Sequence, residues 1–243
     1  MSATVEKAAE RGRPSYSWQF GQERRLSLIA EITPLEDKTI LDIGCGVGTY
    51  VKRFRKFSAK VVGVDVEFER VKRGSADSPN LMVAEGEHLP FESNSFDIIL
   101  LNEVIEHVTD DAQTLREAVR VAKPGGHVVV YAPNRLYPLE THGIYVGKKF
   151  IYRLTPFVNW TPNFIRNKFV PHARVYLGKD LSRLIKGLPV TVVTAHYVFP
   201  GYDKIFRRSR AVGTLLRKVT YAMERSPFRR LGISHFFVIR KDS

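Results

Sequence analysis

Short apolar runs alternate with amphipathic segments over residues 37–134. The runs at 40–43, 60–65, 81–84 and 95–101 have the length of strands, and three of them are followed by segments whose apolar residues recur every three or four positions. Continuous short apolar runs are typical of strands buried on both faces of a parallel sheet, and the longer period is typical of helices. The pattern therefore predicts an α/β fold built on an open parallel sheet.

The regular alternation ends after a fifth apolar run. Residues 137–171 mix aromatic and basic side chains with several prolines, which exclude one long helix, so we expect an insertion here and not a strand. The elements expected after it are a helix near 179–186, a strand near 189–199, a basic helix over 203–225 and a final strand over 232–239.

The N-terminal segment is expected to cover part of the core. Residues 1–15 are polar, and the apolar spacing after Phe20 predicts a helix that ends at Pro34. Trp18 and Phe20 suit either a cover over a ligand site or a hydrophobic staple. We interpret the chain as a single domain. Its expected parts are an N-terminal cover (1–36), a ligand-binding core (37–134), an insertion (135–178) and a C-terminal half (179–243) that includes the basic helix 203–225.

A run of alternating glycines marks the turn between the first strand and its helix. At Gly44, Gly46 and Gly48 the backbone must bend sharply and let a ligand approach closely. Asp65 ends the second strand, where a carboxylate can accept two hydrogen bonds from a ribose diol. The Gly-x-Gly-x-Gly spacing, with Asp42 just before it, differs from the Gly-x-Gly-x-x-Gly spacing of dinucleotide sites. These residues predict a ligand that contains a nucleoside.

This combination resembles motif I of the class I S-adenosylmethionine-dependent methyltransferases, and the phrase RVAKPGG before the fifth strand resembles the same family. The resemblance covers about residues 38–133. It implies S-adenosylmethionine as cofactor and a Rossmann-like, seven-stranded, mostly parallel sheet between helices, with a final antiparallel strand between strands five and six. The cofactor-binding residues that it implies are Asp42, Gly44, Gly46 and Gly48 for the methionine part, Asp65 for the ribose, Glu85 and Gly86 for the adenine, and Asn102 beside the methyl group.

The block Glu103-x-x-Glu106-His107 follows the fourth strand, at the end where ligands bind in such sheets. His107 is the expected catalytic base, and on a helix Glu103 and Glu106 would share its face. The block resembles one in ubiquinone-biosynthesis O-methyltransferases and in small-RNA 3′-terminal 2′-O-methyltransferases, which use such residues around a divalent ion. That resemblance makes Glu103, Glu106, His107 and the later His172 candidate ligands of a cation such as Mg²⁺. A metal-free base or substrate contact and a structural cap are the alternatives.

The nature of the acceptor is predicted less directly. His142 and Tyr145, in the insertion, are candidate substrate contacts. The Glu-x-x-Glu-His block and the families that it resembles favour an oxygen atom over a nitrogen atom as the methyl acceptor. We expect O-methylation of a small or lipid-like acceptor, with RNA methylation as the alternative. An NAD-dependent dehydrogenase is disfavoured by the glycine spacing and by Glu85, and a non-catalytic binding module is disfavoured by an intact motif I.

Positive charge is concentrated in the second half of the chain. The formal net charge is +13, with 7 Lys/Arg against 1 acidic residue in 135–176 and 9 against 2 in 201–230. Such asymmetry indicates an anionic partner. The aromatic residues among the basic ones favour an anionic membrane surface over nucleic acid.

The remaining sequence features bear on location. The chain has no apolar run of spanning length and no signal-like N-terminus, and its single cysteine, Cys45, suits a reducing compartment. We therefore expect a cytoplasmic protein that associates peripherally with a membrane. The sequence predicts neither the oligomeric state nor the identity of the acceptor.

Overall fold

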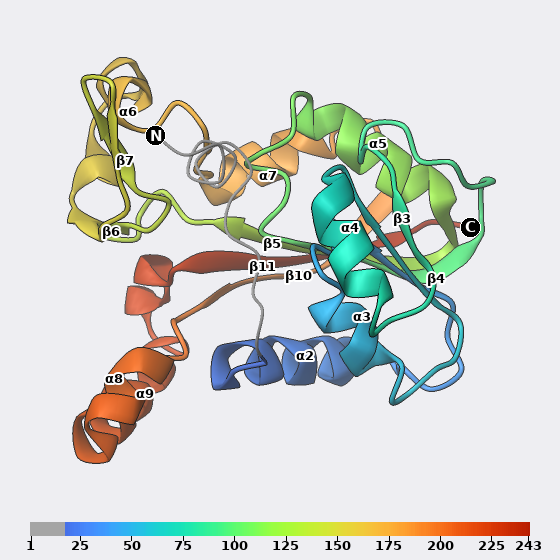
Figure 1. The fold of residues 1–243 in the computed structure, drawn as a ribbon, viewed down its shortest axis with the longest axis horizontal. Helices are drawn as coiled ribbons and strands as arrows, with labels where there is room; N and C mark the ends of the chain where they lie inside the picture. The colour runs from blue at the N-terminus through green and yellow to red at the C-terminus, as the bar shows by residue number, and fades with distance from the viewer. Residues whose placement is uncertain (1–17) are drawn as a thin grey trace.

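The computed structural model describes residues 18–243, and its centre is a seven-stranded sheet (Figure 1). The strands lie in the order β10-β11-β5-β4-β1-β2-β3. Their bounds are β1 Ile40–Ile43, β2 Val61–Asp65, β3 Leu81–Val83, β4 Phe96–Asn102, β5 Ala122–Pro133, β10 Val190–Val198 and β11 Ser234–Lys241. Strands β1 to β5 pair in parallel, whereas β11 is antiparallel to both β5 and β10. The predicted fold class is confirmed, including the place of the last strand.

The register of the sheet brings the ends of several strands to one edge. Asn102 at the end of β4 pairs with Tyr131 near the end of β5. Pro133, which ends β5, pairs with Ser234 of β11, and Ser234 pairs with Val198, which ends β10. The chain segments that leave β4, β5 and β10 therefore emerge side by side.

Helices cover both faces of the sheet, and each face has its own apolar core. Their bounds are α2 Phe20–Ile32, α3 Thr49–Phe54, α4 Phe68–Ser75, α5 Asp111–Val121, α6 Asn163–Phe169, α7 Gly178–Leu184, α8 Asp203–Arg208 and α9 Arg210–Met223. On one face, α5 and α7 contribute Leu115 and Leu181 to the core; on the other, α2 and α3 contribute Ile29 and Phe54. All four of these side chains are at most 1% exposed. The continuous apolar runs of the central strands are explained by this burial on both sides.

The N-terminal helix lies close to its predicted position. Helix α2 ends at Ile32, two residues before Pro34. Trp18 packs edge-to-face against Tyr50, with 5.0 Å between the ring centroids. The polar segment 1–15 lies outside the described residues. Within residues 18–243, none of the helices has the length and apolarity that crossing a membrane requires.

Three expectations about local structure are corrected. The insertion does contain short strands, in two antiparallel pairs: β6 Leu139–Glu140 with β9 Thr155–Pro156, and β7 Ile144–Val146 with β8 Lys149–Ile151. Gly147 permits the reversal between β7 and β8, because its φ is 60°. The basic helix is divided into α8 and α9 at Ser209, whose Oγ accepts the Val212 N–H. The segment KPGG, expected to come before the fifth strand, belongs to β5, whose register with β4 shifts there.

Candidate active site

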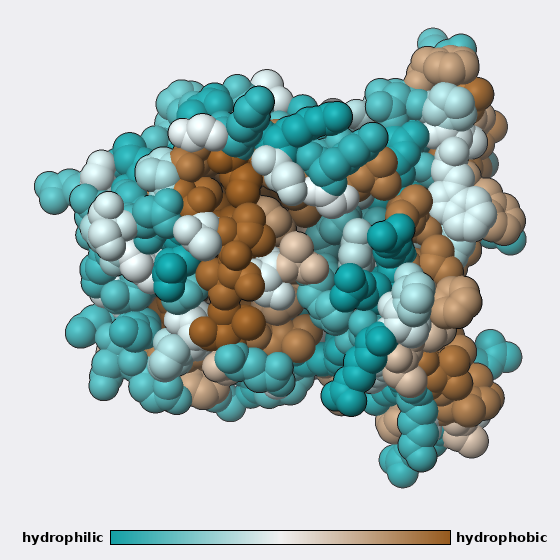
Figure 2. Space-filling view, turned by 180° about the vertical axis from the view of Figure 1, so that it is seen from behind, coloured by the Kyte–Doolittle hydropathy of each residue, from teal (hydrophilic) through white to brown (hydrophobic). Residues whose placement is uncertain are grey.

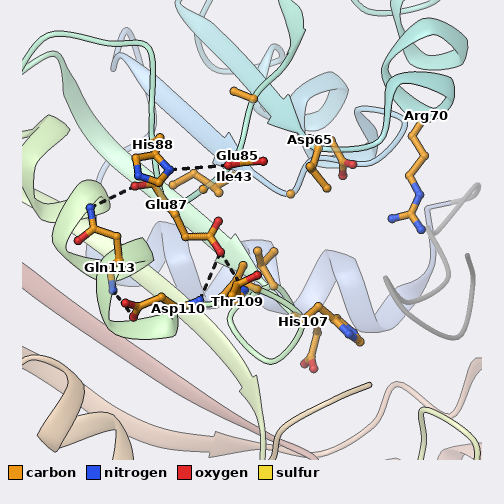
Figure 3. A pocket seen from close by; sticks show the side chains of 17 residues that line it. Ile43, Asp65, Arg70, Glu85, Glu87, His88, His107, Thr109, Asp110 and Gln113 are labelled. Atoms are coloured by element: carbon orange, nitrogen blue, oxygen red, sulfur yellow. Dashed lines mark hydrogen bonds and ion pairs between the residues drawn. The ribbon is translucent and has the colours of Figure 1, made fainter. Parts of the chain in front are cut away.

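A pocket of about 640 Å³ opens at the carboxyl ends of the parallel strands (Figure 3). Its walls come from the turns after β1, β2, β3 and β4 and from the start of α5. Residues with polar side chains on these walls are Asp65, Arg70, Glu85, Glu87, His88, Glu103, His107, Thr109, Asp110 and Gln113. Four of the predicted cofactor-binding residues, Gly44, Asp65, Glu85 and Gly86, line this pocket.

The backbone of the glycine turn is left-handed at all three glycines. Gly44, Gly46 and Gly48 have φ angles of 70°, 57° and 75°, in the left-handed region that favours glycine. A Cβ atom on Gly44 would overlap the side chain of Val104, which packs directly against this glycine. Gly44 therefore lines the pocket with its backbone alone, next to Val104.

The acidic residues of the predicted site differ in environment. Asp65 is 5% exposed, and its two carboxylate oxygens accept the N–H groups of Gly46 and Glu67 at 2.8 and 2.9 Å. Asp42 lies inside β1 behind the pocket, where burial and the charge of Asp65 raise its pKa well above the ordinary value. Glu85 is solvent-exposed on the pocket rim, 3.7 Å from His88. Only Asp65 thus combines burial with a place on the wall.

Glu103 departs from the arrangement expected for the Glu-x-x-Glu-His block. Residues 103–107 form a turn and not a helix, and Glu103 itself has a φ of 57°. The bend lets its carboxylate accept hydrogen bonds from Arg25 of α2, at 2.8 Å, and from Ser234 of β11. Arg25 also donates to the Asn102 side chain. Glu103 therefore turns toward α2 and does not share a helical face with Glu106.

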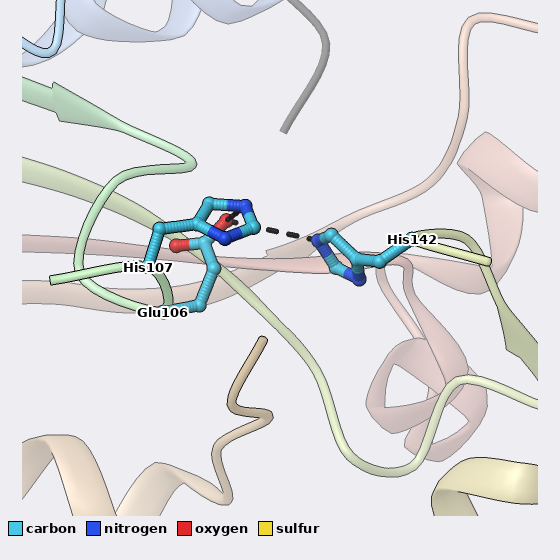
Figure 4. A group of neighbouring side chains, drawn as sticks. All are labelled: Glu106, His107 and His142. Atoms are coloured by element: carbon cyan, nitrogen blue, oxygen red, sulfur yellow. Dashed lines mark ion pairs between the residues drawn. The ribbon is translucent and has the colours of Figure 1, made fainter. Parts of the chain in front are cut away.

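Glu106, His107 and His142 form a compact cluster next to the pocket (Figure 4). One carboxylate oxygen of Glu106 lies 3.9 Å from Nε2 of each histidine, and all three ligand atoms lie within 4.8 Å of one another. Glu106 is 2% exposed, and neither of its carboxylate oxygens has a hydrogen-bond partner among the described residues. His107 also lines the pocket, so it connects the cluster to that pocket.

Burial and neighbouring charges separate the pKa values of the three groups. Burial raises the pKa of Glu106 to about 7. Burial lowers the pKa of His107 to about 4, helped by the charge of His142. Burial would also lower the pKa of His142, but the carboxylates of Glu106 and Glu140 outweigh it and raise the value to about 10. At neutral pH the cluster thus combines a neutral His107, a protonated His142 and a carboxyl group near its midpoint.

A buried chain of polar groups behind His142 fixes its orientation. Nδ1 of His142 donates to Glu140 at 2.8 Å, and Glu140 accepts from Arg166 of α6 at 2.7 Å. Glu140 and Arg166 are 0% and 1% exposed, and Arg166 also donates to the carbonyl of Ala173 and to Asn159. Nε2 of His142 is therefore directed at Glu106 by the insertion itself.

His172 and Tyr145 lie at the edge of this cluster. Nδ1 of His107 lies 3.0 Å from the carbonyl of His172, and Nε2 of His172 lies 3.3 Å from the carbonyl of His142. His172 thus holds His107 in place through its backbone carbonyl. Its ring does not belong to the cluster of Glu106, His107 and His142. The Tyr145 ring packs against His172 at 5.6 Å between centroids.

The structure adds functional candidates that the sequence pattern did not single out. Arg25, Glu140 and Arg166 are the main ones, because they hold Glu103 and His142 in place. Nothing in the local spacing of Arg25 or Arg166 separates them from the many other basic residues. Glu140 stands two positions before His142, and this short spacing is a signal that could have found it.

Comparison with known proteins agrees with this geometry. The methyltransferase domain family matches residues 41–130. The ubiquinone biosynthesis O-methyltransferase of Pseudomonas paraeruginosa is 30% identical over 187 residues, which are 71% of this chain and 77% of that enzyme. The norajmaline N-methyltransferase of Rauvolfia serpentina is 36% identical over 112 residues, which are 42% of this chain but only 38% of that enzyme's length.

Solved structures agree on the fold. An S-adenosylmethionine-dependent methyltransferase from Mesorhizobium loti superposes with a TM-score of 0.59 at 19% identity, covering 89% of this chain and 96% of that one. The PH0226 protein from Pyrococcus horikoshii gives 0.61 at 16% identity, covering 97% and 96%. With the extended match to the Pseudomonas enzyme, the left-handed glycine turn and the sheet order, these likenesses show that the chain belongs to the class I S-adenosylmethionine-dependent methyltransferases.

Proposed function

We propose that this enzyme transfers the methyl group to a hydroxyl oxygen of a small or lipid-like acceptor that it meets at a membrane surface. The observation that carries the proposal is the buried carboxyl group of Glu106, which faces two imidazole nitrogens and has no hydrogen-bond donor among the described residues. The similarity to the ubiquinone-biosynthesis enzyme extends over most of its length and supports an oxygen acceptor. The similarity to the N-methyltransferase is confined to a smaller part of that protein.

A hydroxyl acceptor needs a group that removes its proton, whereas a neutral amine can attack through its lone pair. The bound sulfonium supplies an activated methyl group, so the remaining tasks are alignment and proton removal. Because Nδ1 of neutral His107 donates to the His172 carbonyl, its Nε2 carries a lone pair. In the proposed step the acceptor oxygen bonds to the methyl carbon, the carbon–sulfur bond breaks, and the hydroxyl proton passes to the His107–Glu106 pair. Protonated His142 stabilises the carboxylate of Glu106.

The same three groups also fit a divalent cation such as Mg²⁺, because one carboxylate oxygen and two imidazole nitrogens converge. A cation held by Glu106, His107 and His142 would lower the pKa of the acceptor hydroxyl. Glu103 and His172 would not complete such a site as expected, since Glu103 binds Arg25 and Ser234. The charges of Arg166, Glu140, His142 and Glu106 already balance when all four are ionised. We therefore favour the metal-free cluster.

One labelled reaction tests both the oxygen acceptor and the metal-free cluster. The purified enzyme is incubated with methyl-labelled cofactor and a membrane-lipid extract, with and without a chelator, and the product is identified by mass spectrometry. We expect an O-methyl product and a rate that the chelator does not change. An N-methyl product would contradict the oxygen acceptor. Loss of turnover with the chelator, restored by Mg²⁺ or Mn²⁺, would replace the metal-free cluster by the cation.

We further propose that Asp65 anchors the ribose of the cofactor. Its carboxylate is fixed by two backbone N–H groups and faces the pocket, so it has little freedom to lose on binding. Asp65→Asn turns one acceptor oxygen into a donor that opposes an N–H group. We expect the affinity for S-adenosylhomocysteine to fall about tenfold or more in calorimetry, whereas Glu85→Gln, on the exposed rim, has a smaller effect. Equal losses in the two variants would contradict the assignment.

A further inference from the structure

Two lobes extend from the sheet edge that carries the active site. The insertion lobe (residues 137–171) follows β5, and the helical hairpin (residues 203–225, α8 and α9) follows β10. Pro133, Ser234 and Val198 are paired in register across β5, β11 and β10, so both lobes start from adjacent strands at the same edge. Figure 1 shows the lobes projecting beyond the sheet at the same end of the molecule.

Both lobes expose large apolar side chains. Figure 2 shows apolar surface on each of them, at the right of that view. Phe164 in the insertion lobe is 71% exposed, and Leu215 in the hairpin is 62% exposed. Val212, Leu215 and Val219 share one outward face of α9, since they are spaced by three and four residues. The other exposed apolar residues of the lobes are Val146, Tyr152, Leu154, Phe157, Trp160, Phe169 and Ile205.

The exposed charges of the two lobes are all positive. The basic residues with exposed side chains are Lys148, Lys149, Arg153, Lys168, Lys204, Arg207, Arg208, Arg210, Lys218 and Arg225. The acidic residues of the lobes are Glu140, Asp203 and Glu224, and none is in the exposed class. They are neutralised inside the protein by ion pairs to Arg166, Arg217 and Arg24 respectively. A surface that joins apolar and cationic groups in this way complements an anionic lipid headgroup layer.

We propose that the insertion lobe and the helical hairpin together dock on an anionic membrane, with the outward face of α9 and the aromatic residues of the insertion lobe inserted among the headgroups. This docking rests on the proposed function, from which it takes the lipid-like acceptor. It deepens that function, because docking brings the strand ends that carry Glu106, His107 and His142 to the bilayer. Nucleic acid would satisfy the positive charge but would leave the aliphatic face of α9 in water. Several basic residues, each worth about fivefold in partitioning, suffice for reversible attachment.

Flotation with lipid vesicles tests this docking surface. The full chain, saturated with S-adenosylhomocysteine, is mixed with vesicles of phosphatidylcholine that contain increasing fractions of phosphatidylglycerol, at low and high salt. We expect binding to rise with the anionic fraction and to fall with salt. Leu215→Ser/Val219→Ser and Arg207→Gln/Arg208→Gln each weaken it by about tenfold or more. The control Val192→Ser/Val193→Ser removes apolar residues of β10 that are 43% and 42% exposed and lie away from the lobes. We expect this control to leave vesicle binding unchanged.

The other occupants of this surface give distinct results. Binding to single-stranded RNA at the same salt, without binding to anionic vesicles, would overturn the proposal in favour of RNA. A stable dimer that Leu215→Ser/Val219→Ser converts to a monomer, again without vesicle binding, would assign α9 to a second copy of the chain. Equal vesicle binding by all variants would also contradict it. The vesicle assay needs no methyl acceptor, so a negative result in it leaves the test of O-methylation unaffected. Thermal melting of each variant checks that the variant is folded.

Discussion

Glu106→Gln is expected to lower turnover by about 10²- to 10⁴-fold, the range for loss of a general base, without changing the affinity for S-adenosylhomocysteine. Glutamine keeps the shape of the side chain but has no carboxylate. It therefore cannot share the acceptor's proton with His107, whose Nε2 lies 3.9 Å from the Glu106 carboxylate. The measurement is the initial rate of methyl transfer, with calorimetric titration of S-adenosylhomocysteine as the check on the cofactor pocket. Glu92→Gln, at an exposed acidic residue, is the matched control and retains full activity.

The pH profile makes this expectation sharper. In the wild type the rate should rise as pH passes about 7, because the raised pKa of Glu106 leaves its carboxyl group protonated below that value. In Glu106→Gln this rising limb disappears. The fall of the rate at higher pH, where His142 loses its proton near pH 10, does not depend on Glu106 alone and is still expected in the variant. A variant whose rate stays within a few-fold of the wild type, with the same rising limb, would remove Glu106 from the mechanism.

Arg166→Met is expected to lower the free energy of unfolding by about 3–5 kcal/mol, the range for breaking a buried ion pair on one side. The guanidinium is buried and makes hydrogen bonds to Glu140, Asn159 and the carbonyl of Ala173. Methionine fills a similar volume but leaves those acceptors without their donor. Denaturant unfolding monitored by fluorescence provides the measurement.

Arg135, which comes just before the insertion lobe, supplies the control. Arg135 donates to the Thr161 carbonyl at 2.7 Å but is only half-buried, so Arg135→Met should cost less than about 1 kcal/mol. Adding Glu140→Gln to Arg166→Met removes the carboxylate that has lost its Arg166 partner and should recover part of the loss. If Arg166→Met and Arg135→Met destabilise the protein equally, the buried chain of polar groups does not hold the insertion together.

The fold was predictable because it follows from local patterns. Continuous apolar runs such as Ile98–Leu101 identify buried parallel strands, and the Asp110 cap, whose side chain accepts the Gln113 N–H, fixes the start of α5. The short strands of the insertion were not predictable in this way. Two- and three-residue ladders bury too little apolar surface to leave a periodic signal, and the division between α8 and α9 depends on one serine.

The site was predictable only where it is local in sequence. The glycine turn and Asp65 lie within or next to the strands that the pattern identifies, and Gly44 and Asp65 line the pocket. Glu103 was assigned to a helical face because sequence spacing cannot reveal a left-handed backbone residue. Its partners Arg25 and Ser234 come from elements far away in the chain, and only the tertiary fold brings them together. His142 joins Glu106 for the same reason.

The place of β11 in the sheet separates an early and a late stage in the synthesis of this protein. Strands β1 to β4 pair with one another and can form as soon as their residues leave the ribosome. Among the described residues, β10 pairs only with β11, and β5 keeps one open edge until residues 234–241 are made. Unpaired strand edges are templates for aggregation. A nascent chain halted before residue 234 would therefore carry a complete glycine turn yet depend on chaperones to shield both strands from which the lobes extend.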